Sequence, residues 1–329
     1  MRILIVTPYQ ELIGGVEVVT SILCEQLRLK GHIVDYLTAE APDEISYITR
    51  FKSIFLGLPA ITSARYKKIS KSKYDAVICN GEFSYGIEHR KAFAYFHGSY
   101  LGLKKYSKNF HLKSYLSLTF RSLIQRWGAK GKKVISVSEF LKEILLEQSI
   151  HVDEVISNPI DLTHFAPKKM MDKNKFLFVG RYDYWGKGFD RLEKLALIGH
   201  KIHCFTDRSL ASTGLVFHPF VSNHDMTHIY NSYKILLFPS RFESFGMAAA
   251  EALSCGVPVL MEKVGLAKEL ADNFPEFVVD NFDEIDDVEL KIENILKNYD
   301  ELSFKARLWA QNNFSIKNYL KKWEEVLNA

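Results

Sequence analysis

The stretch PSRFESFGMAAAEALSCGVPV, residues 239–259, indicates the fold class and contains the first candidate site. The apolar residues 235–238 before it predict a buried strand, which the Pro-Ser pair at 239–240 ends. The Ala-rich run after Phe245 predicts a helix that stops at Gly256. A buried strand followed directly by a helix is the repeating unit of α/β domains with parallel sheets.

Two glutamates in this stretch, Glu243 and Glu251, stand eight residues apart. Eight residues span about 12 Å of helix, so Glu243 is expected at the helix N-terminus and Glu251 two turns along nearly the same side. Between them lie the backbone N–H groups of Ser244, Phe245, Gly246 and Met247, which predict an anion site. A nucleotide-sugar suits this pattern, because it has hydroxyl groups at both ends and a diphosphate between them. The alternative is that Glu243 only stabilises the helix dipole and Glu251 is an ordinary surface residue.

The length and composition predict a two-domain globular protein. The 329 residues are too many for one small core, and 47% hydrophobic with 25% charged residues is typical of soluble chains. The four cysteines are scattered, without the spacing of a metal site or disulfide framework, which fits a reducing cytosol. No apolar run approaches the roughly 18 residues that span a bilayer, and the N-terminus lacks a signal-peptide layout. We therefore expect a cytoplasmic protein.

The net charge of +4 is unevenly distributed. Residues 1–165 contain 22 Lys and Arg against 16 Asp and Glu, whereas the remainder contains 21 against 23. The excess lies in residues 50–73 and 99–138, which together contain sixteen basic and no acidic residues. The second segment interleaves them with aromatic residues such as Trp127. This favours an anionic membrane surface or an anionic acceptor, and a solvated basic face remains the alternative. Nucleic acid is not expected, because no binding motif accompanies the charge.

Strand and helix patterns alternate in two successive series. The first series predicts strands at 2–7, 33–38, 74–80, 91–97, 132–138 and 155–159. After a polar segment at 159–173, the second predicts strands at 176–179, 201–205, 216–220, 235–238, 257–261 and 277–279. Two such series predict two Rossmann-like domains with parallel sheets, 1–165 and 166–305. An amphipathic helix within 306–329, with Trp323 on its apolar stripe, is expected to return to the first domain.

Other candidate residues lie where strands end. Gly14 and Gly15 follow the first strand, and a glycine turn there lets backbone approach a phosphate, although such pairs are often only turns. His97 ends another strand, where ligands gather in open α/β sheets. Arg181 and Lys187 follow the first strand of the second series, and two cations there suit a diphosphate leaving group. Two solvated loop cations are the alternative.

The ordered set of these motifs resembles a GT-B glycosyltransferase of the large retaining family with the E-x7-E motif (family 4-like, glycosyl transferases group 1). This family includes sucrose-phosphate synthases and bacterial lipopolysaccharide and mannosyl transferases. The matching residues run along nearly the whole chain: Gly14-Gly15, Lys30-Gly31-His32, His97-Gly98, Ser136 and Ser138, Asn158-Pro159 with Asp161, Gly180-Arg181, Lys187-Gly188, Pro239-Ser240, Glu243, Gly246, Glu251, Gly256 and Pro258-Val259.

The resemblance implies a role for each candidate residue. The backbone at Gly14 and Gly15 is expected to contact donor phosphate. Arg181 and Lys187 are expected to hold the diphosphate together with the backbone N–H groups of residues 244–247. Glu251 is expected to bind the ribose hydroxyls. Glu243 and His97 are expected to face the transferred sugar. The implied reaction retains anomeric configuration and needs no metal or other cofactor. Lys263–Glu269 departs from the family by having one glycine where two are usual, which puts its donor contacts in doubt.

The implied partners are a nucleotide-diphosphate sugar and a glycan or lipid-linked acceptor in cell-surface polysaccharide or lipopolysaccharide synthesis. A peripheral position on the inner face of the cytoplasmic membrane is consistent with the basic segments. Two alternatives share the same sheets and phosphate site, a GT-B nucleotide-sugar epimerase and a non-catalytic nucleotide-sugar-binding protein. The presence of both Glu243 and His97 favours the enzyme, since a sensor would tolerate their loss.

Overall fold

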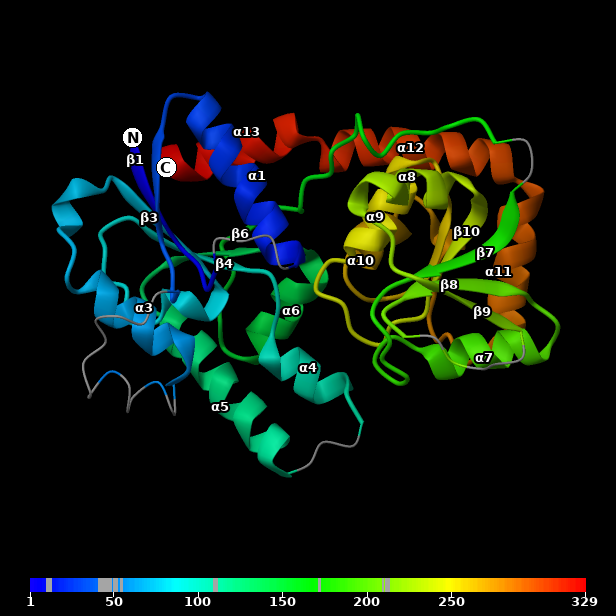
Figure 1. Ribbon diagram of the computed structural model, residues 1–329, viewed down its shortest axis with the longest axis horizontal. Helices are drawn as coiled ribbons and strands as arrows, with labels where there is room; N and C mark the ends of the chain where they lie inside the picture. The colour runs from blue at the N-terminus through cyan, green and yellow to red at the C-terminus, as the bar shows by residue number, and fades with distance from the viewer. Residues whose placement is uncertain are drawn as a thin grey trace. The chain divides into compact units, whose positions relative to one another are not determined.

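The chain folds into two compact units. The computed structural model describes residues 1–9, 14–40, 49, 53, 56–108, 112–170, 173–208, 210 and 214–329 (Figure 1). The first unit comprises Met1–Lys105, Asn109–Ser157 and Tyr319–Ala329, and the second comprises Tyr106–Lys108 and Asn158–Asn318. The expected domain limits, 1–165, 166–305 and 306–329, remain a prediction.

The first unit is built on a six-stranded sheet of order β2-β1-β3-β4-β5-β6, in which all pairs are parallel. Its strands are β1 (Arg2–Val6), β2 (Ile33–Leu37), β3 (Ala76–Asn80), β4 (Ala92–Phe96), β5 (Lys133–Ser136) and β6 (Glu154–Val155). The central strands β3 and β4 are buried at every position, as expected for a sheet covered on both faces.

Helices flank this sheet (Figure 1). They are α1 (Gly15–Leu29), α3 (Leu58–Tyr66), α4 (Tyr100–Tyr106), α5 (Leu112–Ala129), α6 (Glu139–Glu147) and α13 (Ile316–Asn328), with short 3₁₀ helices η1 (Lys71–Lys73) and η2 (Gly81–Ser84). In α13 the ring of Trp323 is fully buried and packs edge-on against Tyr95 of β4, with ring centroids 5.1 Å apart. This burial ties the end of the chain to the first sheet.

The second unit contains another parallel six-stranded sheet, of order β12-β11-β10-β7-β8-β9. Its strands are β7 (Asn174–Val179), β8 (Ile202–Thr206), β9 (Leu215–Pro219), β10 (Tyr233–Phe238), β11 (Val259–Glu262) and β12 (Val278–Val279). Its helices are α7 (Phe189–Leu197), α8 (Asn223–Asn231), α9 (Met247–Ser254), α10 (Ala267–Ala271), α11 (Ile285–Lys297) and α12 (Tyr299–Phe314), with η3 (Pro275–Phe277). Two parallel sheets with flanking helices confirm the predicted fold class.

Each predicted strand has a counterpart in the structure, and most limits differ by one or two residues. The prediction of a strand at 155–159 was wrong in extent, because β6 ends at Val155. Pro159 has no N–H group for a sheet hydrogen bond, and Ile160 instead pairs with Ser315 in an isolated bridge. Within the residues that the structure describes, no helix is long and apolar enough to cross a membrane.

Candidate functional site

In the second unit, two neighbouring strands bring Lys187 and Glu243 together. β7 and β10 pair in parallel, so the loops after their carboxyl ends lie side by side. The ammonium group of Lys187, from the loop before α7, forms an ion pair with Glu243 Oε1, from the loop before α9. The Lys187 side chain is 28% exposed and the Glu243 side chain 16%. A cation and a carboxylate predicted to serve one ligand are thus in direct contact.

Close backbone packing holds the loops around this pair. Gly188 has φ 75°, and a Cβ there would lie 2.3 Å from the carbonyl oxygen of Pro239. Gly265 has φ 59°, and a Cβ there would lie 2.3 Å from the carbonyl oxygen of Phe245. The next amide, Leu266 N–H, donates to that same carbonyl at 2.8 Å. The single glycine of the Lys263–Glu269 segment therefore packs against the loop that carries Glu243.

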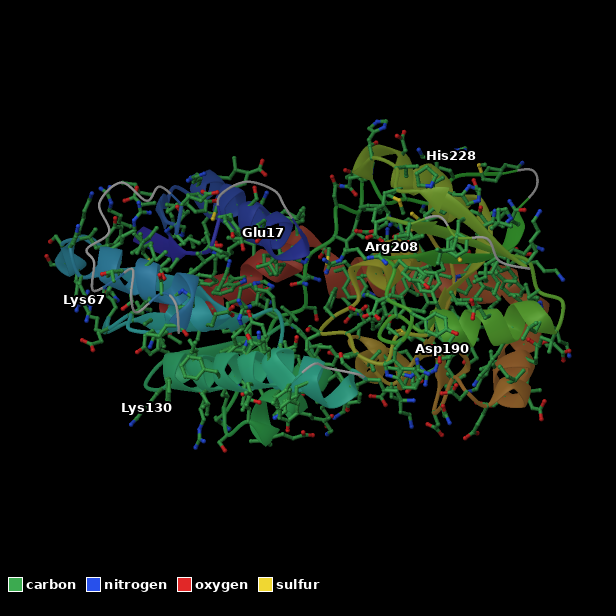
Figure 2. All side chains as sticks on the ribbon, turned by 60° about the horizontal axis from the view of Figure 1, so that its bottom comes forward. Glu17, Lys67, Lys130, Asp190, Arg208 and His228 are labelled. Atoms are coloured by element: carbon green, nitrogen blue, oxygen red, sulfur yellow. The ribbon has the colours of Figure 1, made fainter. Side chains whose placement is uncertain are left out.

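A buried charge network, which the sequence analysis did not identify, supports the same loops. Arg241 donates two hydrogen bonds to Asp190, at 2.8 and 2.7 Å, and one to the carbonyl of Trp185. Its guanidinium also lies 3.3 Å from the centroid of the Trp185 ring. Figure 2 labels Asp190 at the start of α7. Arg191, also buried, pairs with Asp283. In sequence, Arg241 resembles an ordinary loop cation, and its proximity to Glu243 was the only available signal.

The N-terminus of α9 lies next to Glu243 in the chain. Gly246, the residue before the helix, has φ 97°, in the left-handed region that favours glycine. Phe245 is buried and packs against Phe314, so only its backbone is available to a ligand. Ser244 and Met247 are half-buried. The first N–H groups of α9 lack partners within the helix, which leaves the anion site that the sequence predicted chemically available.

Because α9 begins at Met247, four residues after Glu243, Glu251 lies only about one turn into the helix rather than the expected two, and it is half-buried rather than on the open surface. Its carboxyl accepts a hydrogen bond from the hydroxyl of buried Tyr230 at 2.7 Å. Burial raises the pKa of Glu251 to about 7, although the Tyr230 hydrogen bond acts in the opposite direction. The predicted ribose-binding residue is therefore a carboxyl group that titrates near neutral pH.

Arg181 also lies in the loop between β7 and α7, where its side chain is exposed. It forms no ion pair with the residues that the structure describes. Lys187 and Arg181 thus differ, since one is already paired with a carboxylate and the other is solvated.

In the first unit, a cavity of about 230 Å³ lies at the carboxyl ends of the strands. It is lined by Pro8, Val16, Glu17, Asn80, Gly81, Glu82, Phe83, His97, Gly98, Ser99, Tyr100, Leu103 and Gln125. Both ring nitrogens of His97 are buried and have no hydrogen-bond partner among the described residues. Burial lowers the pKa of His97 to about 3, so the imidazole is neutral at physiological pH. A neutral, unpartnered imidazole in a cavity can position a hydroxyl group without exchanging a proton.

Glu82 lines the same cavity and was not predicted. The hydroxyl of Tyr100 donates to Glu82 Oε1 at 2.5 Å, and Arg121 donates to that hydroxyl at 3.2 Å. Burial raises the pKa of Glu82, while the Tyr100 hydrogen bond lowers it. The sequence signal was the polar run at 80–82, directly after an apolar strand.

Gly14 and Gly15 lie at the start of α1, directly before Val16 and Glu17, which line this cavity. Figure 2 labels Glu17 on this helix. Gly14 has φ −160°, an extended conformation open to any residue. A Cβ at Gly14 would lie 3.3 Å from Glu17 Oε2, the end of a flexible side chain that can move aside, so neither backbone conformation nor space requires glycine at this position.

Some of the other matching residues delimit elements. Ser138 caps α6 by accepting from Leu141 N–H at 3.0 Å, and Ser136 donates to the Ser138 carbonyl at 2.8 Å. Asp161 accepts from Thr163 and His164 in a turn. In the part of the chain that the structure describes, no group of three or more His, Cys, Asp or Glu residues is arranged to hold a metal ion.

Two family descriptions match the sequence. "Glycosyl transferases group 1" matches residues 194–312, and "Glycosyltransferase Family 4" matches residues 13–164. A protein of Klebsiella pneumoniae described as an uncharacterized 41.2 kDa protein in the cps region is 26% identical over 170 residues, 48% of this chain and 47% of that protein. The serotype-specific mannosyltransferase WbdA of Escherichia coli is 28% identical over 105 residues, 32% of this chain and 12% of WbdA. The chain thus spans about half or less of the length of these relatives.

Solved structures share the fold over the whole chain. Sucrose-phosphate synthase from Thermosynechococcus elongatus superposes with a TM-score of 0.78 at 20% identity, covering 99% of this chain and 98% of that one. Anabaena HepE, solved in complex with UDP and glucose, superposes with a TM-score of 0.70 at 15% identity, covering all of both chains. The family matches to both halves, together with this shared GT-B fold, confirm the predicted family: the chain belongs to the group 1 glycosyltransferases.

Proposed function

We propose that this protein is a retaining, metal-independent glycosyltransferase that moves a sugar from a nucleotide-diphosphate sugar to a glycan or lipid-linked acceptor. The observation that carries the proposal is the contact of Lys187 with Glu243 beside the N-terminus of α9. The ion-paired Lys187 and Glu243, the anion-binding terminus of α9 and the Glu251 carboxylate about one turn into that helix match the diphosphate, sugar and ribose of such a donor. The UDP and glucose bound to HepE support a nucleotide-sugar as the donor class.

In the proposed reaction, the bond between the anomeric carbon and the diphosphate oxygen breaks. The acceptor oxygen bonds to the same face of the sugar and gives its proton to the departing diphosphate. Lys187 and Arg181 neutralise the charge that develops on the leaving group, which is the interaction that strengthens in the transition state. Glu243 and neutral His97 position the sugar. Glu251 binds the ribose hydroxyls.

The acceptor is proposed to belong to cell-surface polysaccharide or lipopolysaccharide synthesis. Support comes from the K. pneumoniae relative in a cps region and from WbdA, a serotype-specific mannosyltransferase. The sixteen basic residues of 50–73 and 99–138 agree with a peripheral position at an anionic surface. Arg50, Lys52 and Phe110 of these segments lie outside the described residues.

Thermal-shift measurements with UDP-, GDP- and dTDP-sugars test the donor class, because a bound ligand raises the melting temperature by mass action. The donor that binds is then incubated with candidate acceptors, and NMR reads the anomeric configuration of the product. We expect retention, with EDTA leaving the rate unchanged. Inversion or loss of activity in EDTA would contradict the mechanism. Donor conversion to an isomer without acceptor would instead identify an epimerase, and binding without turnover a non-catalytic protein.

A further inference from the structure

Helix α5 presents apolar side chains outward from the first unit. Leu112, Leu116, Leu123 and Trp127 recur at spacings of four, seven and four residues and are 73%, 57%, 37% and 48% exposed. At 100° per residue these four positions fall within about 60° of one another on the helix. The buried residues of α5 are Ser122, Ile124, Gln125, Gly128 and Ala129, most of them small or polar. The most apolar stripe of α5 therefore faces away from the core.

Basic residues accompany this stripe without any acidic residue. Residues 112–138 contain six Lys and Arg and no Asp or Glu. Arg126 lies between about 40° and 100° from the stripe positions by the same helical geometry, Lys130 directly follows the end of α5, and both are exposed. Figure 2 labels Lys130 beyond the end of α5, on the outside of the unit. A solvated basic face does not explain the stripe, because solubility does not require exposed leucines.

A groove at the C-terminal end of α5 concentrates more positive charge. It has a volume of about 690 Å³, and its charged or titratable lining consists of Arg126, Lys130, Lys132, His151 and Asp153. The carboxylate of Asp153, the acidic residue of this lining, already accepts a hydrogen bond from Val134 N–H at 2.7 Å. None of the three Lys and Arg residues forms an ion pair with the described part of the chain. Trp127 lines the same groove, which joins it to the apolar stripe.

We propose that α5 is a membrane-docking helix that lies in the interface of an anionic bilayer, with the groove at its end receiving a phosphate-bearing headgroup. Apolar side chains would enter the acyl boundary, Trp127 would lie at headgroup depth, and the basic residues would contact anionic lipid. The absence of acidic residues from the whole helix favours a bilayer over a protein partner. This inference deepens the proposed membrane-surface position and rests on it.

Sedimentation of the full chain with vesicles tests the proposal, using phosphatidylcholine alone or mixed with phosphatidylglycerol. We expect binding to the mixed vesicles only, weakened by salt. Removing one basic residue is expected to weaken binding about fivefold, the equivalent of about 1 kcal/mol, so Arg126→Glu with Lys130→Glu should cost more than tenfold. Leu112→Ser with Leu116→Ser should also reduce binding. Leu197→Ser with Leu290→Ser, equally exposed leucines of the second unit, and Lys321→Glu serve as matched controls that should bind normally.

Brominated lipids give a second readout, because Trp127 is the exposed one of the four tryptophans. Quenching should be strong in the parent protein and lost in Trp127→Phe. Equal binding to neutral and mixed vesicles, no binding, absent quenching, or a dimer whose contact is broken by the α5 variants would each overturn the proposal. These measurements contain no sugar donor or acceptor, so a negative result would not contradict the proposed glycosyl transfer. That function is tested separately by donor binding and product analysis.

Discussion

Lys187 and Glu243 lie 56 residues apart in sequence and form an ion pair in the second unit. Each follows a strand of the same parallel pair, β7 and β10, so the sheet determines their contact. Within this ion pair the carboxylate partly neutralises the cation. A diphosphate that binds Lys187 must compete with Glu243, and the sugar that Glu243 is proposed to contact would release the cation to the diphosphate. In the proposed mechanism, the pair would therefore couple sugar recognition to leaving-group stabilisation.

The first prediction concerns the cations. Lys187→Ala and Arg181→Ala should each slow transfer about 10²–10³-fold, because each removes a group that neutralises developing charge on the diphosphate. Steady-state kinetics measure the loss, and circular dichroism checks the fold. Lys201→Ala, an exposed lysine elsewhere in the second unit, should have normal activity. Near-normal turnover in both test variants would show that these cations do not serve the diphosphate.

The second prediction concerns Glu243. Glu243→Gln should lower kcat, because the carboxylate is proposed to act on the reacting sugar. The same change frees Lys187, so the affinity for the nucleoside diphosphate alone should stay equal or increase. Calorimetry with the nucleoside diphosphate and kinetics with the full donor separate the two effects. An increase in KM at constant kcat, with weaker nucleoside diphosphate binding, would contradict this role.

The fold was predictable from sequence because it depends on local patterns. The apolar run at 235–238 and the Ala-rich run after Phe245 became β10 and α9 with limits close to those expected. Residues 74–75 and 91, predicted within strands, lie just outside β3 and β4. Strand identity follows from side-chain burial, whereas strand ends depend on tertiary hydrogen bonds that the sequence does not display.

Residues of the candidate site could be predicted from sequence only where they follow a recognisable strand pattern. His97 and Lys187 follow strands, so their positions could be inferred. Glu82 and Arg241 also follow strands, but their partners, Tyr100 and Asp190, are 18 and 51 residues away. The burial of Glu251 against Tyr230 depends on helix α8 packing beside α9, which one amphipathic pattern does not specify.

The third prediction concerns stability. Arg241→Lys should destabilise the second unit by about 1.5–3 kcal/mol, because lysine keeps the positive charge but cannot make both hydrogen bonds to Asp190 or stack on Trp185. Denaturant unfolding measures the change. Lys305→Ala breaks the exposed pair with Glu301 and should give no measurable change. If Arg241→Lys is as stable as the parent protein, the network is not what holds the loops.

The fourth prediction concerns the ionisation of Glu251. Its pKa of about 7 in the folded protein exceeds the ordinary 4.5, so the folded state retains a proton that the unfolded chain has lost between these values. This contribution to stability is fully present below pH 4.5 and is lost as pH rises through 7, by at most about 3 kcal/mol. Glu251→Gln should remove this pH dependence. The contribution of His97 to stability has the opposite pH dependence, because its pKa is lowered to about 3. That contribution is present above pH 6.5 and is lost as the pH falls towards 3.

The same ionisation should appear in donor binding. Ribose hydroxyls that donate to Glu251 favour the carboxylate, so binding between pH 5 and 7 should release a proton, and affinity should increase up to about tenfold per pH unit before levelling above 7. Calorimetry in two buffers of different ionisation enthalpy counts the proton. Glu243→Gln should retain the release, and Glu251→Gln should lose both the proton and the pH dependence. If the parent protein binds donor equally at pH 5.5 and 7.5 without releasing a proton, Glu251 does not contact the ribose.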